Sequence, residues 1–149
     1  MRIKLDVPLS LSRIAKYAKG SAPNKDAIIE YITTDSRECR KNDVFIALMG
    51  ENFNGNDFLE EAKSKGAYLI GSVDGCDICV SNTENALLNI ASAYKSKLKS
   101  LCVTVGITGS VGKTGTKEIL KRLLASKYRV HANEANYNNA IGLSATILS

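Results

Sequence analysis

A glycine-rich turn at residues 108–114 (TGSVGKT) constrains the fold of this chain more than any other feature. It follows a nearly continuous apolar run at 101–107 (LCVTVGI) and precedes an amphipathic segment at 113–127. The apolar side chains of that segment, which we expect to face inward, are Ile119, Leu120, Leu123 and Leu124. A buried parallel strand, a tight turn and a helix in this order, with a further strand at 128–132, predict a βαβ unit.

The same turn has the residue types of a phosphate-binding loop. Its backbone N–H groups would face an anion, and the following helix would add positive potential. Lys113 can reach the β- and γ-phosphates of a nucleotide, and the Thr114 hydroxyl can bind Mg²⁺. The pattern G-x-x-x-x-G-K-[ST] asks for glycine where Ile107 stands, whereas the shorter form T-G-x-x-G-K-T fits fully. The alternative is a glycine turn with a surface lysine, which the flanking strand and helix patterns disfavour. The predicted phosphate-binding residues are Thr108, Gly109, Ser110, Val111, Gly112, Lys113, Thr114 and Gly115.

The rest of the chain alternates between helix and strand patterns. Helices are predicted at 10–19, 56–65, 82–97 and 140–149, and strands at 27–33, 43–49, 67–72 and 78–80. The fold class is therefore α/β. We expect a small N-terminal α/β lobe at 1–82, followed at 83–149 by the start of a P-loop parallel-sheet domain that looks truncated.

Composition narrows the class of protein. The 149 residues include 20 Lys and Arg against 15 Asp and Glu, a net charge of +5 that suits an anionic ligand. The basic residues are spread along the chain, which argues against nucleic acid as a partner. No stretch has the roughly 18 apolar residues of a membrane span, and Lys4, Asp6 and Arg13 interrupt any signal peptide. We therefore expect no membrane insertion and a cytoplasmic location. The cysteines, expected to be free thiols, are Cys39, Cys76, Cys79 and Cys102.

Three segments together carry a family resemblance. They are 107–120 (ITGSVGKTGTKEIL), 34–37 (TDSR) continued by 43–50 and 54–58, and 136–143 (NYNNAIGL). In this order they resemble the ATP loop, the uridine-nucleotide lobe and a later stretch of the Mur ligases, cytoplasmic enzymes that form amide bonds in peptidoglycan synthesis. The last segment, with Thr116, Lys117 and Glu118, is similar to one branch of the family. Members of that branch join D-alanyl-D-alanine to UDP-N-acetylmuramoyl-tripeptide, so the resemblance implies these two substrates.

The resemblance also implies a mechanism and cofactors. ATP would phosphorylate the substrate carboxylate to an acyl phosphate, and the amine of D-alanyl-D-alanine would displace the phosphate. Lys113 as the catalytic residue, and Mg²⁺ on Thr114, would neutralise the transferring phosphoryl group. Ser36 and Arg37 would lie near the uridine diphosphate. Asn138 and Asn139 would face the muramoyl side of the cleft.

The chain departs from the family pattern at several points. Gly115 stands where the family usually has Thr or Ser, and Asn56 stands where His is common. The family's ligases are about three times longer, so we expect this chain to be an incomplete portion that is inactive alone. The alternatives are another Mur-type or folylpolyglutamate-type ligase, or a non-catalytic nucleotide-binding module.

Weaker signals have plainer interpretations. The C-x-x-C of Cys76 and Cys79 could complete a zinc or redox site, but no second C-x-x-C exists, so packed thiols are favoured. His131 is the only histidine, which argues against a hydrolase triad. Asp35 could be a turn partner of Arg37 as readily as a ligand contact. The run Glu60, Glu61, Lys63 and Lys65 is predicted to be a solvated helix face.

Overall fold

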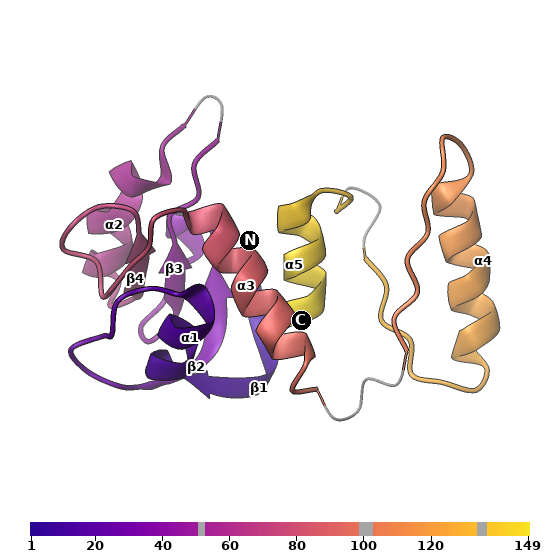
Figure 1. Ribbon diagram of the computed structural model, residues 1–149, viewed down its shortest axis with the longest axis horizontal. Coiled ribbons are helices and arrows are strands. Elements are labelled where there is room, and N and C mark those ends of the chain that lie inside the picture. The colour runs from indigo at the N-terminus through magenta and orange to yellow at the C-terminus, as the bar shows by residue number, and fades with distance from the viewer. Residues whose placement is uncertain (51–52, 99–102, 134–136) are drawn as a thin grey trace.

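The computed structural model describes residues 1–50, 53–98, 103–133 and 137–149 (Figure 1). Cys102, the first residues of the predicted strand at 101–107, and Asn136 lie outside these ranges.

The described part contains one sheet of five strands in the order β1-β2-β3-β4-β5. The strands are β1 (Arg2–Ser10), β2 (Ile28–Thr33), β3 (Val44–Ile46), β4 (Tyr68–Gly71) and β5 (Ile78–Cys79). β1 is antiparallel to β2, and each later strand is parallel to the one before it. The carboxyl ends of β2 to β5 therefore meet at one edge, where ligands bind in open α/β sheets. The four strands predicted before residue 81 are confirmed, whereas β1 was not predicted.

The helices also begin and end close to the predicted bounds. They are α1 (Leu11–Ala18), α2 (Leu59–Ser64), α3 (Thr83–Lys95), α4 (Lys113–Ala125) and α5 (Ala140–Leu148). Ser10, Asn82 and Asn139 cap α1, α3 and α5, because each side chain accepts a hydrogen bond from a backbone N–H in the first turn. A 3₁₀ turn, Gly55–Phe58, precedes α2 and occupies the first part of the helix predicted at 56–65.

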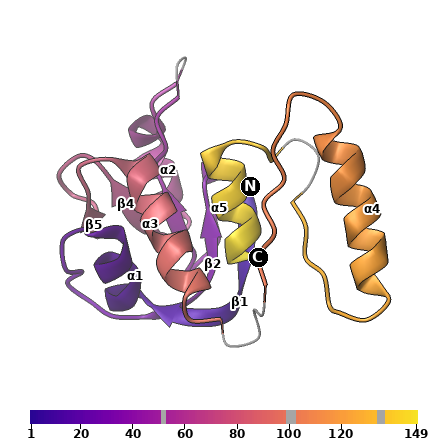
Figure 2. The same cartoon turned by 45° about the vertical axis from the view of Figure 1, so that its right-hand side comes forward.

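The two faces of the sheet have separate cores because successive strand side chains point to opposite sides. Val44 and Ile46 of β3 join the larger core, which α1, α3 and α5 cover on one face (Figures 1 and 2). Phe45 of β3 joins the smaller core, with Leu59 and Ala62 of α2, on the other face. The N-terminal part is thus an α/β layer with helices on both faces of a mainly parallel sheet.

Helices α3 and α5 pack on each other, and α5 also reaches β1. Leu87 and Ile90 of α3 share the larger core with Leu148 of α5. The buried Tyr94 hydroxyl accepts a hydrogen bond from the Val7 backbone N–H at 2.6 Å, which ties α3 to the irregular part of β1. α5 therefore joins a segment after the glycine-rich turn to the core of the first layer. The division into lobes at 1–82 and 83–149 stays a prediction.

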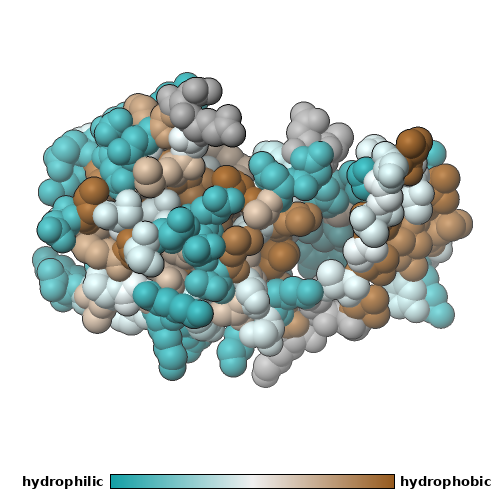
Figure 3. Space-filling model, turned by 45° about the horizontal axis from the view of Figure 1, so that its top comes forward, coloured by the Kyte–Doolittle hydropathy of each residue, from teal (hydrophilic) through white to brown (hydrophobic). Residues whose placement is uncertain are grey.

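The βαβ unit predicted around the glycine-rich turn is wrong in two respects. Residues 103–107 and 128–132 form no strand, because no strand of the described chain lies beside them to supply ladder hydrogen bonds. None of the α4 side chains is buried, and Ile119 and Leu123 are 63% and 67% exposed rather than inward-facing. α4 lies at the end of the molecule away from α2 and β4, and apolar side chains are exposed there (Figures 1 to 3). No helix in the described residues is long and apolar enough to cross a membrane.

Candidate functional site

The glycine-rich turn opens α4 as predicted. Gly109 and Gly112 have φ angles of 149° and 84°, a region that side-chain-bearing residues rarely adopt. Gly112 is the N-cap of α4 and its carbonyl accepts the Thr116 backbone N–H at 2.9 Å. The first turn of α4 contains no acidic residue, so nothing there offsets the positive end of the helix dipole. The loop is therefore shaped to receive an anion.

The side chains of this loop face solvent. Residues 108–115 are all exposed, and the Lys113 ammonium bends back to donate a hydrogen bond to the Gly109 carbonyl. Thr114 forms no side-chain hydrogen bond with any described residue, so its hydroxyl oxygen is accessible to a hard cation. A Cβ at Gly115 would meet no atom within 4 Å, so packing does not require the glycine there.

The second predicted site lies at the carboxyl end of β2. Residues Ser36–Glu38 form a 3₁₀ turn whose N-cap, Asp35, accepts the Arg37 backbone N–H. Arg37 is 83% exposed and forms a bidentate ion pair with Asp35, with N–O distances of 2.9 and 2.7 Å. Ser36 is buried, and its hydroxyl donates to a carboxylate oxygen of Glu61 at 2.5 Å. The turn thus presents a guanidinium outward and turns the serine inward.

Other loops at the same sheet edge are connected by Asn56, which stands where the resembled family commonly has His. Its amide donates to Ser72 Oγ and Asn54 Oδ1, both at 3.0 Å. It therefore joins the turn after β3 to the end of β4. Beside it, an isolated antiparallel bridge pairs Met49 with Asn54, and the side chains of Met49 and Phe53 are 59% and 56% exposed.

The ion pair with Arg37 lowers the pKa of Asp35 to about 2, chiefly through the side-chain hydrogen bond. Because the folded pKa lies below the unfolded one, the pair's contribution to stability is complete above about pH 4 and is lost as the pH falls through about 2. We expect Arg37→Ala to move the Asp35 titration midpoint upward toward its ordinary value, as followed by carboxyl-carbon NMR. Arg40→Ala is the matched control and should leave the midpoint near 2. An unchanged midpoint in Arg37→Ala would show that another group holds the carboxylate ionised.

Asn138 and Asn139 are exposed at the start of α5. The Asn139 side-chain oxygen accepts the Gly142 backbone N–H at 2.8 Å, so it caps the helix. Gly142 packs closely on Tyr137, since a Cβ there would approach Tyr137 Cα to 2.6 Å. The predicted contact of Asn138 and Asn139 with a muramoyl group stays a prediction.

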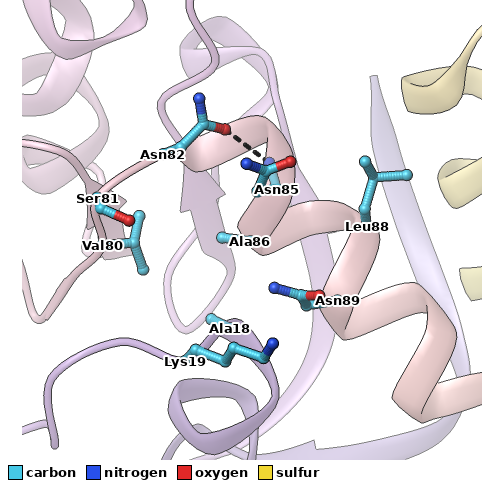
Figure 4. Close-up of a pocket in the computed structure, with 9 residues that line it drawn as sticks. All are labelled: Ala18, Lys19, Val80, Ser81, Asn82, Asn85, Ala86, Leu88 and Asn89. Atoms are coloured by element: carbon cyan, nitrogen blue, oxygen red, sulfur yellow. Dashed lines mark hydrogen bonds between the residues drawn. The ribbon is translucent and has the colours of Figure 1, made fainter.

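The structure does not gather all the predicted residues at one place. The turn that contains Ser36 and Arg37 lies between β2 and β3, whereas Lys113 begins α4 at the other end of the molecule (Figures 1 and 2). A shallow pocket of about 400 Å³ lies elsewhere, between the end of α1 and the start of α3 (Figure 4). Its polar lining residues are Lys19, Ser81, Asn82, Asn85 and Asn89, and none of the predicted site residues is among them.

The weaker signals have structural explanations. Cys39, Cys76 and Cys79 are free thiols, and burial raises the pKa of Cys39 to about 11. No group of three or more potential metal ligands was found in the part of the chain that the structure describes. His131 is exposed, with its Nε2 3.1 Å from the Ser149 hydroxyl.

Glu61 of α2 and Lys65, the C-cap residue of that helix, were assigned too little importance from the sequence. Glu61 and Lys65 have the spacing of a solvated helical ion pair, but both also contact the turn that contains Ser36. Their partners lie 25 to 29 positions earlier in the chain, so no local signal indicates the contact.

Two family descriptions match separate parts of this chain. "Mur ligase family, catalytic domain" matches residues 28–72, and "Mur ligase middle domain" matches residues 107–149. A UDP-N-acetylmuramoyl-tripeptide–D-alanyl-D-alanine ligase of Bacillus subtilis is 35% identical over 94% of this chain and 33% of its own length. The ligase of the same name from Synechocystis is 36% identical over 84% of this chain and 29% of its own length. The chain therefore spans about a third of the curated relatives it matches.

Solved structures of MurF ligases also resemble the chain in fold. A MurF structure from Acinetobacter baumannii superposes with a TM-score of 0.85 at 27% identity, over 98% of this chain and 34% of that one. MurF ligase from Thermotoga maritima, solved in complex with ADP, has a TM-score of 0.68 and 39% identity, over 78% of this chain and 28% of that one.

Proposed function

Since the chain belongs to the Mur ligase family, we propose that its 149 residues supply the nucleotide-sugar lobe and the phosphate loop of an ATP-dependent, cytoplasmic amide ligase. The proposed reaction joins D-alanyl-D-alanine to UDP-N-acetylmuramoyl-tripeptide in peptidoglycan synthesis. One observation carries the proposal. The exposed T-G-x-x-G-K-T loop opens a helix in a chain that aligns almost throughout with ligases of this one specificity. We expect the chain alone to bind nucleotide weakly and to form no amide.

The phosphate loop would bind the triphosphate of ATP. Backbone N–H groups at the start of α4 would donate to the phosphates, and the helix dipole would add to their effect. Lys113 would leave the Gly109 carbonyl and donate to the β- and γ-phosphates. The accessible Thr114 hydroxyl fits one oxygen ligand of Mg²⁺, which when bound would neutralise charge on the phosphates.

The chemistry is a phosphoryl transfer followed by an acyl transfer. A carboxylate oxygen of the UDP-linked substrate takes the γ-phosphoryl group, and ADP leaves. The amine of D-alanyl-D-alanine then attacks the acyl carbon, and inorganic phosphate leaves. Lys113 would stabilise the negative charge on the phosphoryl group during the first step, in keeping with preorganised positive charge as the main catalytic effect.

The turn after β2 would bind the uridine diphosphate. Arg37 presents its guanidinium to solvent at the carboxyl edge of the sheet and can form bidentate hydrogen bonds to phosphate. The Ser36 hydroxyl hydrogen is engaged by Glu61, so only its oxygen lone pairs remain for the ligand. Asn138 and Asn139 are proposed to contact the muramoyl side.

Calorimetric titration with UDP-N-acetylmuramoyl-tripeptide tests this assignment. We expect binding by the unmodified chain and a loss of affinity of about tenfold in Arg37→Ala, the size of one charge-assisted hydrogen bond. Arg40→Ala removes a nearby exposed arginine and should bind as the unmodified chain does. Absence of UDP-ligand binding, with Mg-ATP binding retained, would instead favour a P-loop protein of another specificity.

A further inference from the structure

The turn that presents Arg37 is attached to α2 by polar side chains, in addition to the packing of Cys39, which follows the turn, on Leu59 and Ala62. The Lys65 ammonium donates to the Ser36 carbonyl at 2.8 Å and to the Arg37 carbonyl at 3.2 Å. Glu61 accepts the Ser36 hydroxyl at 2.5 Å. Three contacts therefore join two neighbouring residues of the turn to Glu61 of α2 and to Lys65, its C-cap residue.

The same two side chains also hold each other. Lys65 lies 2.9 Å from Glu61 Oε1, while Oε2 of Glu61 takes the Ser36 hydroxyl. All three ammonium hydrogens of Lys65 thus have acceptors, which leaves none for a ligand. The pKa of Glu61 is lowered, first by Lys65 and then by Ser36, so the carboxylate stays charged. The polar atoms of Lys65 and Glu61 are therefore engaged with the turn and with each other.

Other contacts of the turn hold its two ends rather than the backbone of residues 36 and 37. Glu38 pairs with the N-terminal ammonium at 2.9 Å, and the Thr33 hydroxyl bonds to the Asp35 backbone at 3.1 Å. The turn contains only Ser36–Glu38, and the Arg37 side chain is 83% exposed, with Asp35 as its partner. The place where the guanidinium stands depends on the backbone of residues 36 and 37. Two of the carbonyls of that backbone are bound by Lys65.

We propose that Lys65 and Glu61 are positioning residues that hold the Ser36–Glu38 turn so that Arg37 meets a phosphate group of the nucleotide ligand. They act through the turn and do not touch the ligand. This inference rests on the proposed function, because it takes Arg37 as a phosphate contact.

A double-mutant cycle with UDP as the probe tests the coupling. Lys65→Met keeps the length and apolar stem but removes the donors, and we expect it to weaken UDP binding about fivefold. In the Arg37→Ala background the same change should weaken UDP binding less than about twofold, because the residue through which Lys65 acts is already gone.

A second variant and a control complete the test. Glu61→Gln, which keeps an acceptor for Ser36, should lose less affinity for UDP than Lys65→Met. Lys63→Met is the matched control, since Lys63 is 60% exposed and, among the described residues, its ammonium pairs only with Glu60, at 3.8 Å. Additive losses for Lys65→Met and Arg37→Ala would overturn the proposal.

Amide hydrogen exchange provides a test that does not depend on ligand binding. The Glu38 and Cys39 N–H groups donate to the Asp35 and Ser36 carbonyls at 3.1 and 3.2 Å. Lys65→Met should accelerate exchange at these two amides about fivefold or more, with the Phe45 amide of β3 unchanged. Unchanged exchange at both would overturn the positioning role even if UDP binds. If the unmodified chain binds no UDP while exchange does accelerate, the proposed function fails, and with it the role of Arg37 as a phosphate contact.

Discussion

Replacing Asp43 by alanine is expected to lower the free energy of unfolding by about 3 kcal/mol or more. Asp43 is 2% exposed at the start of β3, and its carboxylate accepts hydrogen bonds from Arg2 Nε at 2.7 Å and Arg2 Nη2 at 3.0 Å. The Arg40 backbone N–H adds a third at 2.9 Å. Removing the carboxylate leaves the Arg2 guanidinium without its partner. The loss is large because an uncompensated, partly buried charge remains.

Arg2 has a second contact, with the ring of Tyr31 in β2. Its guanidinium lies 3.6 Å from the centre of that ring, and its hydrogen bonding to the Asp43 carboxylate raises its pKa. Together these contacts join β1, β2 and the start of β3 near the carboxyl end of β2, where the Ser36–Glu38 turn begins. Chemical denaturation monitored by circular dichroism measures the effect. Asp74→Ala, at an exposed aspartate, is the control and should change stability by less than about 0.5 kcal/mol. A loss below about 1 kcal/mol for Asp43→Ala would show that this pair behaves as an ordinary surface ion pair.

The hydrophobic pattern predicted most elements, because both helix and strand periodicities are visible in short windows. β1 was missed because its pattern is interrupted. Ile3 and Leu5 face the core, but the register with β2 then shifts between Lys4 and Leu9, so the alternation does not continue through Val7 and Pro8. A period of two cannot be recognised across such an irregularity.

Strand formation depends on a partner that composition does not reveal. Residues 101–107 were predicted as a strand from their apolar side chains, and residues 128–132 were predicted as the next strand from their place after the helix. Val103 and Val105 are 74% and 55% exposed, and no strand in the described ranges pairs with them. Apolarity thus indicates a tendency to be buried, while a ladder also needs a neighbour with free N–H and C=O groups.

The two candidate sites differ in how much of them could be predicted. The phosphate loop is contiguous, so its glycines, Lys113 and Thr114 could be identified from spacing alone. The turn at Arg37 depends on Glu61 and Lys65, whose i,i+4 spacing is that of any solvated helical pair. Contacts between segments 25 or more residues apart become visible only once the fold brings α2 beside the turn.

Lys113→Ala is expected to weaken Mg-ATP binding by about 10- to 100-fold, the range for one lost charge-assisted hydrogen bond. In the structure the Lys113 ammonium donates to the Gly109 carbonyl, a neutral acceptor that a phosphate oxygen would replace. Because the lysine is predicted to reach the β- and γ-phosphates, AMP should lose almost nothing in the same variant.

Calorimetric titration of Lys113→Ala and Lys121→Ala with Mg-ATP and with AMP distinguishes a direct contact of Lys113 with phosphate from general electrostatic attraction. Lys121→Ala is the matched control, since Lys121 lies on the same exposed helix two turns after Lys113. It removes the same charge from α4 without touching the loop, so it should change the ATP affinity less than about twofold. Equal losses of ATP affinity in Lys113→Ala and Lys121→Ala would mean that the positive charge of α4 as a whole attracts the triphosphate. An ATP-selective loss confined to Lys113 would mean that the loop binds the terminal phosphates, which the proposed phosphoryl transfer requires.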